Sequence, residues 1–131
     1  MIGRLRSVVV DGREPAALAE FYAELLGGQV TVSDADWVVL TTPGGIRLAF
    51  QRSPEHEAPR FPDPAGSQQF HLDIEVDDID AAEQKVLTLG AVRVPDAGDE
   101  GPEDTFRVFR DPAGHTFCFV WDQDGEPVNA G

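Results

Sequence analysis

His71 and Cys118 carry the side chains of this chain that are best suited to metal binding or acid–base chemistry. Imidazole and thiolate groups bind zinc and related metals, and histidine changes its charge most easily near neutral pH. A catalytic zinc site needs about three protein ligands and an open position, so these two residues are too few. Asp73 follows His71 by two positions, and an extended strand places both side chains on one face. Asp73 is therefore the only reasonable third ligand.

The residues alone leave the role of this group open. Three roles are compatible with His71. It could be a cavity side chain that is hydrogen-bonded to a neighbour, or a residue that contacts a ligand or transfers a proton. It could also be part of a metal site with Cys118 and Asp73. Cys118 and His71 would act as nucleophile and base only if they made hydrogen-bond contact and a third group oriented the base. A buried cysteine more often packs as a small hydrophobic residue. We therefore expect no cofactor here, with a divalent metal as the alternative.

The elements that must position these residues are predicted to repeat. Alternating or β-branched runs predict strands, and apolar residues at helical spacing predict helices. In the first half, the expected elements are a strand at 5–10, a helix at 15–26, and strands at 29–32, 37–42 and 46–51. In the second half, they are a strand at 70–76, a helix at 79–89, and strands at 91–94, 105–110 and 116–121. Both halves therefore read as βαβββ.

The repeat assigns partners to His71 and Cys118. An offset of 64 residues aligns Ser7 with His71, and an offset of 69 aligns Ala49 with Cys118. We expect these four residues to face one cavity, together with residues of the same strand parity. The residues of that parity are Val9, Trp37, Val39, Arg47, Gln51, Asp73, Phe106, Val108 and Thr116.

Two features of this set indicate the kind of ligand. Trp37 and Phe106 occupy equivalent positions in the repeat, which suits a flat or apolar small molecule unless both only fill space. Arg47 either fixes an acidic group of a ligand or is a solvated surface charge. The acidic loop at 95–104 is expected to be solvated, with a lid over a site as the alternative.

This plan resembles the vicinal oxygen chelate superfamily, which includes glyoxalase I, extradiol dioxygenases and bleomycin-resistance proteins. The resemblance runs from about Arg4 to Trp121, and it is carried by EPAALAEFYAELLGG, FHLDIEVDDIDAAEQKVLTLGA and FRDPAGHTFCFVW. It implies an α+β fold in which two βαβββ modules form a curved, barrel-like sheet around a central cavity, with the helices outside. It also implies a homodimer.

The resemblance further implies where a metal would bind. The family's ligands are typically His, Gln or Glu on the first and last strands of each module, and by motif they fall on Ser7, Ala49, His71 and Cys118. His71 matches this pattern, whereas Cys118 stands where glutamate is expected. Ser7 is a poor ligand and Ala49 is none. The implied scaffold is thus one for metal chemistry whose metal site is largely missing.

Length and composition bound the remaining possibilities. The 131 residues suffice for one domain, with modules at 1–52 and 69–122, a proline-rich connector at 53–68 and a tail at 123–131. The 10 basic and 24 acidic residues give a net charge of −14, which argues against nucleic acid or anionic membranes as partners. A single cysteine, no signal peptide and no apolar stretch approaching ~18 residues predict a cytoplasmic location.

Together these observations predict a metal-independent protein that binds a small molecule, of the sequestration or resistance type. The alternative is a metal-dependent lyase, isomerase or dioxygenase of the glyoxalase type. A third possibility is a protein-interaction module whose cavity is filled by its own side chains. His71 is the candidate catalytic residue. The candidate ligand-binding residues are Ser7, Trp37, Arg47, Ala49, Gln51, His71, Asp73, Phe106, Thr116 and Cys118.

Overall fold

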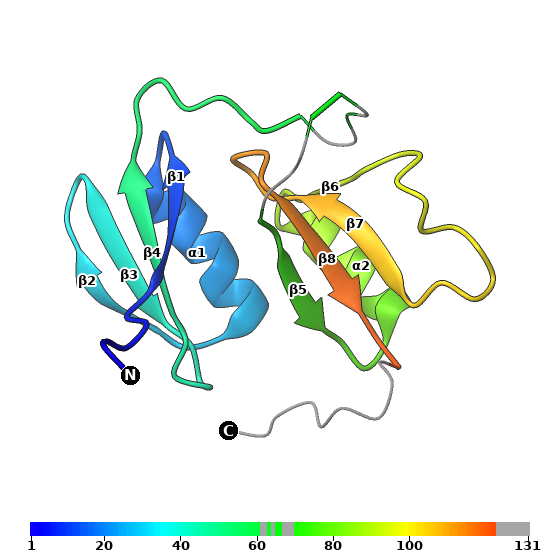
Figure 1. Ribbon diagram of the computed structural model, residues 1–131, viewed down its shortest axis with the longest axis horizontal. Helices are drawn as coiled ribbons and strands as arrows, with labels where there is room; N and C mark the ends of the chain where they lie inside the picture. Colours follow the sequence, from blue (N-terminus) through cyan, green and yellow to red (C-terminus); the bar gives the residue numbers. More distant parts are fainter. Residues whose placement is uncertain (61–62, 64, 67–69, 123–131) are drawn as a thin grey trace. The chain divides into compact units, whose positions relative to one another are not determined.

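Each half of the chain folds as its own compact unit (Figure 1). The structure is a computed structural model that describes residues 1–60, 63, 65–66 and 70–122. The first unit runs from Met1 to His56, and the second begins at Glu57. Among the described residues, each unit contains the elements βαβββ in that order, which confirms the predicted α+β plan of two modules. The predicted tail at 123–131 and parts of the predicted connector lie outside the described residues.

The first unit is a four-stranded mixed sheet with one helix. Its elements are β1 (Val8–Gly12), α1 (Pro15–Leu26), β2 (Gln29–Ser33), β3 (Trp37–Thr41) and β4 (Arg47–Arg52). The strand order is β1-β4-β3-β2, in which β1 runs parallel to β4 and the other neighbours are antiparallel. The first and last strands of the module are therefore neighbours, as the predicted site requires.

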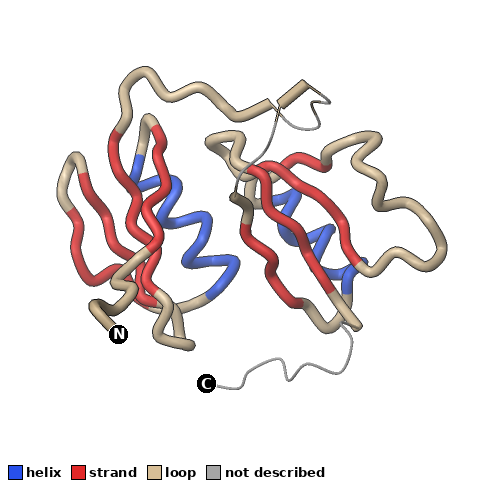
Figure 2. Tube along the Cα trace, in the orientation of Figure 1, coloured by secondary structure: helices blue, strands red, loops and turns tan. Residues whose placement is uncertain are grey.

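Local sequence explains where α1 begins and ends. Pro15 occupies the first turn, where its missing N–H costs nothing. Gly27 ends the helix with a φ of 76°, and its N–H donates to the Ala23 carbonyl at 2.8 Å. The helix then packs on one face of its sheet, because the Tyr22 ring stacks on the Phe50 ring with centroids 5.6 Å apart. Figure 2 shows each helix against one face of the sheet in its own unit.

The second unit repeats this arrangement. Its elements are β5 (Leu72–Glu75), α2 (Ile79–Thr88), β6 (Val92–Arg93), β7 (Phe106–Arg110) and β8 (Thr116–Val120). The strand order is β5-β8-β7-β6, with β5 parallel to β8. The described strands thus form two four-stranded sheets that are not closed into a barrel, and an enclosed central cavity stays a prediction.

The helix α2 is fixed by charges and a cap. Asp78 caps it, because its carboxylate accepts the Ala81 N–H at 3.1 Å. Arg107 of β7 forms ion pairs of 3.2 Å with Asp80 and Glu83 of α2. The sheet face that carries Arg107 is therefore the face toward α2, and strand alternation places the neighbouring positions of β7 on the opposite face.

The acidic loop after β6 differs from its prediction at one residue. The loop was expected to be solvated, but the Asp99 side chain is 0% exposed. Its Oδ2 accepts the Val108 N–H at 2.7 Å and bonds to the Arg93 guanidinium at 2.5 Å. The Asp99 carboxylate thus accepts a hydrogen bond from a backbone N–H at the edge of β7, beyond the end of β6. This bond holds the loop against the sheet.

The strands predicted at 5–10 and 70–76 begin later, at Val8 and Leu72. The parallel ladders start at the Val8–Leu48 and Leu72–Phe117 pairs, so Ser7 and His71 lie just before β1 and β5. Ser7 and His71 nevertheless occupy equivalent positions in the two modules, because each immediately precedes the first pair of its parallel ladder. None of the helices in the described part of the chain has the length and apolar character needed to cross a bilayer.

Candidate functional site

The structure brings His71, Asp73 and Cys118 together on one face of the second sheet. Asp73 of β5 is the register partner of Cys118 of β8. The His71 Nε2 atom lies 3.1 Å from Asp73 Oδ1. The atoms of the three residues that can bind a metal all lie within 4.8 Å of one another. The three residues singled out in the sequence therefore form one cluster, which we call the His–Asp–Cys cluster.

The electrostatics of the cluster keep the thiol protonated at neutral pH. Burial raises the pKa of Cys118 to about 11, and the carboxylates of Asp73 and Asp99 add to this rise while Arg93 opposes it. The Cys118 thiol also hydrogen-bonds to Asp73. Asp73 thus accepts from the thiol and lies at hydrogen-bond distance from His71. The His71 and Asp73 side chains are 40% and 57% exposed, so solvent or a ligand reaches the cluster from their side.

The cluster fits a metal in donor type but only loosely in geometry. Nitrogen, oxygen and sulfur donors from three residues are a set that zinc accepts, with one position left open. Ligand atoms around tetrahedral zinc are about 3.5 Å apart, whereas atoms here are separated by up to 4.8 Å. Binding would also require the Cys118 thiol to lose its proton. A metal would thus have to draw these side chains together.

The equivalent positions in the first unit supply no such cluster. Ala49 of β4 lies between Val9 and Val39 in the register and is fully buried. Ser7 is half-buried and precedes β1. A methyl group cannot bind a metal, and a serine hydroxyl is a poor ligand. That this half contributes no good ligand to a metal site stays a prediction.

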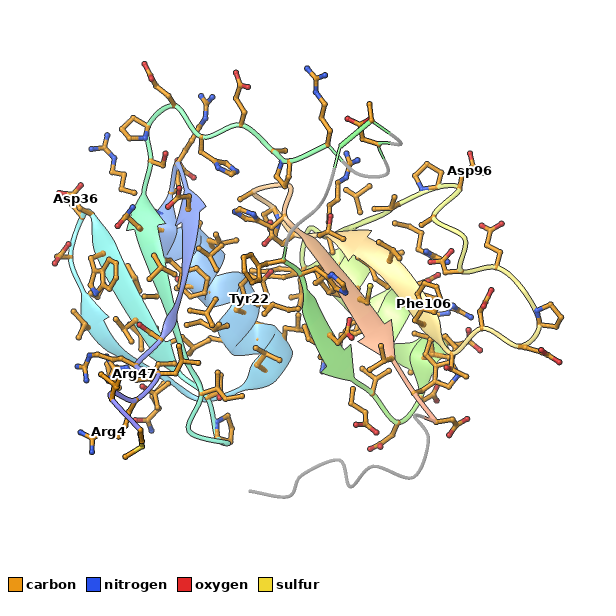
Figure 3. All side chains as sticks on the ribbon, in the orientation of Figure 1. Arg4, Tyr22, Asp36, Arg47, Asp96 and Phe106 are labelled. Atoms are coloured by element: carbon orange, nitrogen blue, oxygen red, sulfur yellow. The ribbon has the colours of Figure 1, made fainter. Side chains whose placement is uncertain are left out.

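The other candidates of the first unit share the face of Ala49. Trp37 is the register partner of Gln51, and Arg47 is the partner of Thr41. The Gln51 amide donates to Asp11 Oδ1 at 3.3 Å. Arg47 is half-buried, with its Nε atom shielded from solvent, and Figure 3 labels it on the sheet of the first unit. Arg47 is therefore more than a surface charge, although a role in ligand binding stays a prediction.

In the second unit, Phe106 and Thr116 lie on the face of Cys118, as strand parity predicts. Phe106 pairs with Val120, and Thr116 pairs with Arg110. Phe106 packs beside a buried group formed by Val94, Val108 and Cys118, and Figure 3 labels it on β7. Thr116 is 5% exposed. This face therefore combines an apolar patch with the polar His–Asp–Cys cluster.

Sequence reasoning missed Arg110 and the pocket beside α2. The alternation that selected Phe106 and Val108 continues to Arg110, so the signal was present in the sequence. The pocket has a volume of about 310 Å³ and is lined by Glu83, Arg93, Asp99, Glu100, Gly101, Asp104, Arg107 and Trp121. Its arginines are paired with Glu83, and Arg93 is also paired with Asp99. Only three-dimensional contacts reveal this pocket, because its lining comes from separate elements without a motif.

Comparison with families and curated proteins gives one match. Residues 7–120 match a family model described as a glyoxalase-like domain. This range takes in both modules, from the residue before β1 to the last residue of β8. No curated protein matches the chain.

Solved structures share the fold at low sequence identity. Oxidase ChaP-H2 is 21% identical with a TM-score of 0.62, and the match covers 96% of this chain and 98% of that chain. The fosfomycin resistance protein FosX from Listeria monocytogenes, in its hexagonal form, is 13% identical with a TM-score of 0.70, covering 95% and 97%. A glyoxylase/bleomycin resistance protein/dioxygenase domain from Frankia sp. EAN1pec is 19% identical with a TM-score of 0.65, covering 96% of each chain. These similarities concern the fold alone.

Proposed function

We propose that this chain, which belongs to the glyoxalase-like domain family of the vicinal oxygen chelate superfamily, binds a small organic molecule without a resident metal. The observation that carries this proposal is the His–Asp–Cys cluster with its protonated thiol. A fold of this kind serves several chemistries, so the function must come from the site.

The cluster needs no metal to be satisfied. Asp73 accepts a hydrogen bond from the Cys118 thiol and is 3.1 Å from the His71 Nε2. A metal would have to displace the thiol proton, and a pKa of about 11 makes that displacement costly near neutral pH. The first unit offers Ser7 and Ala49 in place of further ligands. These facts favour a ligand that makes hydrogen bonds to the cluster directly.

The shape of the ligand is suggested by its apolar neighbours. Phe106, Val108 and Val120 lie beside the cluster on the same face of the second sheet. A molecule with a flat or apolar body would pack on them while a polar group reaches His71 or Asp73. We propose binding of the sequestration or resistance type, and we also propose Trp37 and Arg47 as ligand-binding residues on the sheet face of the first unit.

Thermal denaturation of the purified protein with small aromatic and amphipathic compounds tests this proposal. A compound at about 100 times its Kd should stabilise the fold by ~2.7 kcal/mol, and metal analysis should find no stoichiometric metal. His71→Ala and Asp73→Asn should abolish the stabilisation. His56→Ala and Asp96→Asn are the matched controls, because these residues lie outside the cluster and outside its strands, and both variants should keep the stabilisation. If no compound stabilises the protein, or if the control variants lose the effect too, the proposal fails.

A second function, a metal-dependent lyase, isomerase or dioxygenase of the glyoxalase type, is favoured by one observation. His71, Asp73 and Cys118 place three potential ligand atoms within 4.8 Å of one another, and they are the residues that would hold the ion. A bound divalent metal would polarise a substrate oxygen as a Lewis acid. One equivalent of zinc, nickel, iron or manganese in the purified protein, lost in His71→Ala and kept in His56→Ala, would replace the first proposal with this one.

We also propose that the protein is a cytoplasmic homodimer. Cys118 is a free, buried thiol, which suits a reducing compartment. Light scattering coupled to size-exclusion chromatography should give twice the chain mass of 14.2 kDa at micromolar concentration. A mass of one chain over that range would rule out a stable dimer.

A further inference from the structure

We propose that Thr116 and Arg110 bind an oxyanion of the ligand, such as a carboxylate, phosphate or phosphonate group. This inference rests on the proposed function and names the chemical class of its ligand. Thr116 of β8 and Arg110 of β7 are register partners across the hairpin that joins these strands. Both share the parity of Cys118 and Phe106, so both side chains belong to the face of the His–Asp–Cys cluster.

His71 extends this pair into a row. Leu72 of β5 pairs with Phe117 of β8, so the preceding residues of the two parallel segments, His71 and Thr116, are the next positions in the register. The row therefore reads His71, Thr116, Arg110 across the sheet. A hydroxyl lies between an imidazole and a guanidinium, and all three groups can donate hydrogen bonds to an anion.

The Thr116 hydroxyl is the observation that points to a ligand. Thr116 is 5% exposed, and its Oγ1 atom has no hydrogen-bond partner in the described part of the chain. Buried polar groups are nearly always paired, because an unpaired group loses its hydrogen bonds to water without replacement. A ligand oxygen that accepts from Thr116 would supply the missing bond.

The internal repeat supports a shared purpose for the arginine and threonine. In the first unit the same pair occurs with its members exchanged, because Arg47 of β4 pairs with Thr41 of β3. The guanidinium Nε atoms of Arg47 and Arg110 are both shielded from solvent. Both arginines are half-buried on the faces of their sheets, so part of each guanidinium is withdrawn from water.

The two pairs differ in their hydroxyls, which assigns the site to the second unit. The Thr41 hydroxyl is 3.2 Å from the Thr31 hydroxyl and forms a hydrogen bond with it. The Thr116 hydroxyl has no such partner among the described residues. The Thr41 hydroxyl is therefore already paired within its own sheet, whereas the Thr116 hydroxyl is buried without a partner among the described residues.

Asp73 is the group that opposes an anion here. It lies two residues beyond His71 on β5, about 7 Å along the strand. Its carboxylate is engaged by the Cys118 thiol and lies beside the His71 ring, which reduces its repulsion of a nearby anion. An oxyanion between Thr116 and Arg110 would thus lie nearer to these two hydrogen-bond donors than to the Asp73 carboxylate. The rest of the ligand would extend over the apolar patch of Phe106, Val108 and Val120.

Titration of isotopically labelled protein with phenylphosphonate, followed by NMR, tests the assignment, and benzyl alcohol serves as the uncharged probe. Phenylphosphonate should shift the amides of β7 and β8 around Arg110 and Thr116. Thr116→Val should weaken phenylphosphonate binding about tenfold, and Arg110→Gln about 10- to 100-fold, the range for hydrogen bonds to charged groups. Neither change should affect the Kd of benzyl alcohol. Thr41→Val is the matched control and should bind phenylphosphonate like the wild type.

A second readout separates binding from folding. Thr116→Val removes an unsatisfied hydroxyl at nearly constant volume, so the ligand-free variant should melt at a higher temperature while binding phenylphosphonate more weakly. A structural role for the hydroxyl would lower the melting temperature instead. If Arg110→Gln fails to fold by circular dichroism, Arg110→Lys replaces it, because lysine keeps the charge but loses the bidentate fork.

The outcomes distinguish this inference from the proposed function. Wild-type phenylphosphonate affinity in both Thr116→Val and the Arg110 variant overturns the inference. If benzyl alcohol shifts the amides near His71 while phenylphosphonate binds nowhere, small-molecule binding stands and the oxyanion site falls. If neither probe nor any compound of the thermal panel binds, both proposals fail.

Discussion

Cys118 illustrates how its surroundings change the chemistry of one side chain. An exposed thiol ionises near pH 9, but burial and the carboxylates of Asp73 and Asp99 raise the pKa of Cys118 to about 11. The thiolate is the reactive form of cysteine. Cys118 therefore serves as a hydrogen-bond donor to Asp73, and its raised pKa does not favour a role as nucleophile at neutral pH.

Alkylation of Cys118 should be slow in the folded protein. A rise of about two pKa units, from 9.0 to about 11, lowers the thiolate population about 100-fold at pH 8, and burial slows access further. Iodoacetamide labelling followed by mass spectrometry should show at least this difference between native protein and protein unfolded in urea. Asp73→Asn removes a negative neighbour and should speed native labelling, whereas Glu75→Gln should change it little. Equal rates in native and unfolded protein would contradict the assigned environment.

The site residues were predictable to different degrees. The two-residue period of strands and the internal repeat were sufficient to select His71, Asp73 and Cys118, because both depend only on spacing. The same rules selected Thr116 but could not show that its hydroxyl lacks a partner. Whether a hydroxyl is satisfied depends on neighbours from other strands, and those neighbours are fixed by register and not by local sequence.

At the scale of elements, the loop at 95–104 is held to its sheet by one carboxylate. Pro95 directly follows the predicted strand at 91–94 and has no N–H with which to continue the ladder, and β6 itself spans Val92–Arg93. The Val94 N–H still donates to the Val108 carbonyl at 3.0 Å. Asp99 then accepts the Val108 N–H. Sequence alone predicted an acidic loop but could not identify which of its carboxylates turns inward.

Asp99→Asn should destabilise the second unit in a pH-dependent way. Burial raises the pKa of Asp99, but the hydrogen bonds from Arg93 and Val108 outweigh it, so the pKa of Asp99 lies below its usual value. The ionised form is therefore favoured by folding, and its contribution is present above the ordinary pKa of about 4 and lost as the pH falls below that value. Urea unfolding should show the variant less stable by about 1–3 kcal/mol at pH 7, with a smaller difference at pH 3.

The matched control for this change is Asp96→Asn. Asp96 belongs to the same loop, is exposed and has a φ of 55°, a conformation that asparagine also tolerates. This variant should unfold like the wild type at both pH values. A loss of stability in Asp99→Asn that is equal at pH 7 and pH 3 would show that the carboxylate charge is not the stabilising feature.

At the scale of the whole molecule, the repeat was the most informative property of the sequence. Two halves with the same order of patterns predicted two modules with the same strand order, and the sheets are β1-β4-β3-β2 and β5-β8-β7-β6. The ligand was not predictable in the same way. Each module tolerates different residues at equivalent positions, such as Ala49 and Cys118, and those few positions decide the chemistry while the shared pattern decides the fold.

The parallel pairing within each module has a consequence for when the His–Asp–Cys cluster forms during synthesis. Among the described strands, the first strand of each module pairs with the last, through pairs such as Val8–Leu48 and Leu72–Phe117. A growing chain therefore cannot place β5 until β8 has left the ribosome. His71 and Asp73 meet Cys118 in that final step, so the site is absent from every earlier intermediate. The proposed ligand binding at this cluster would therefore report that the second module is complete.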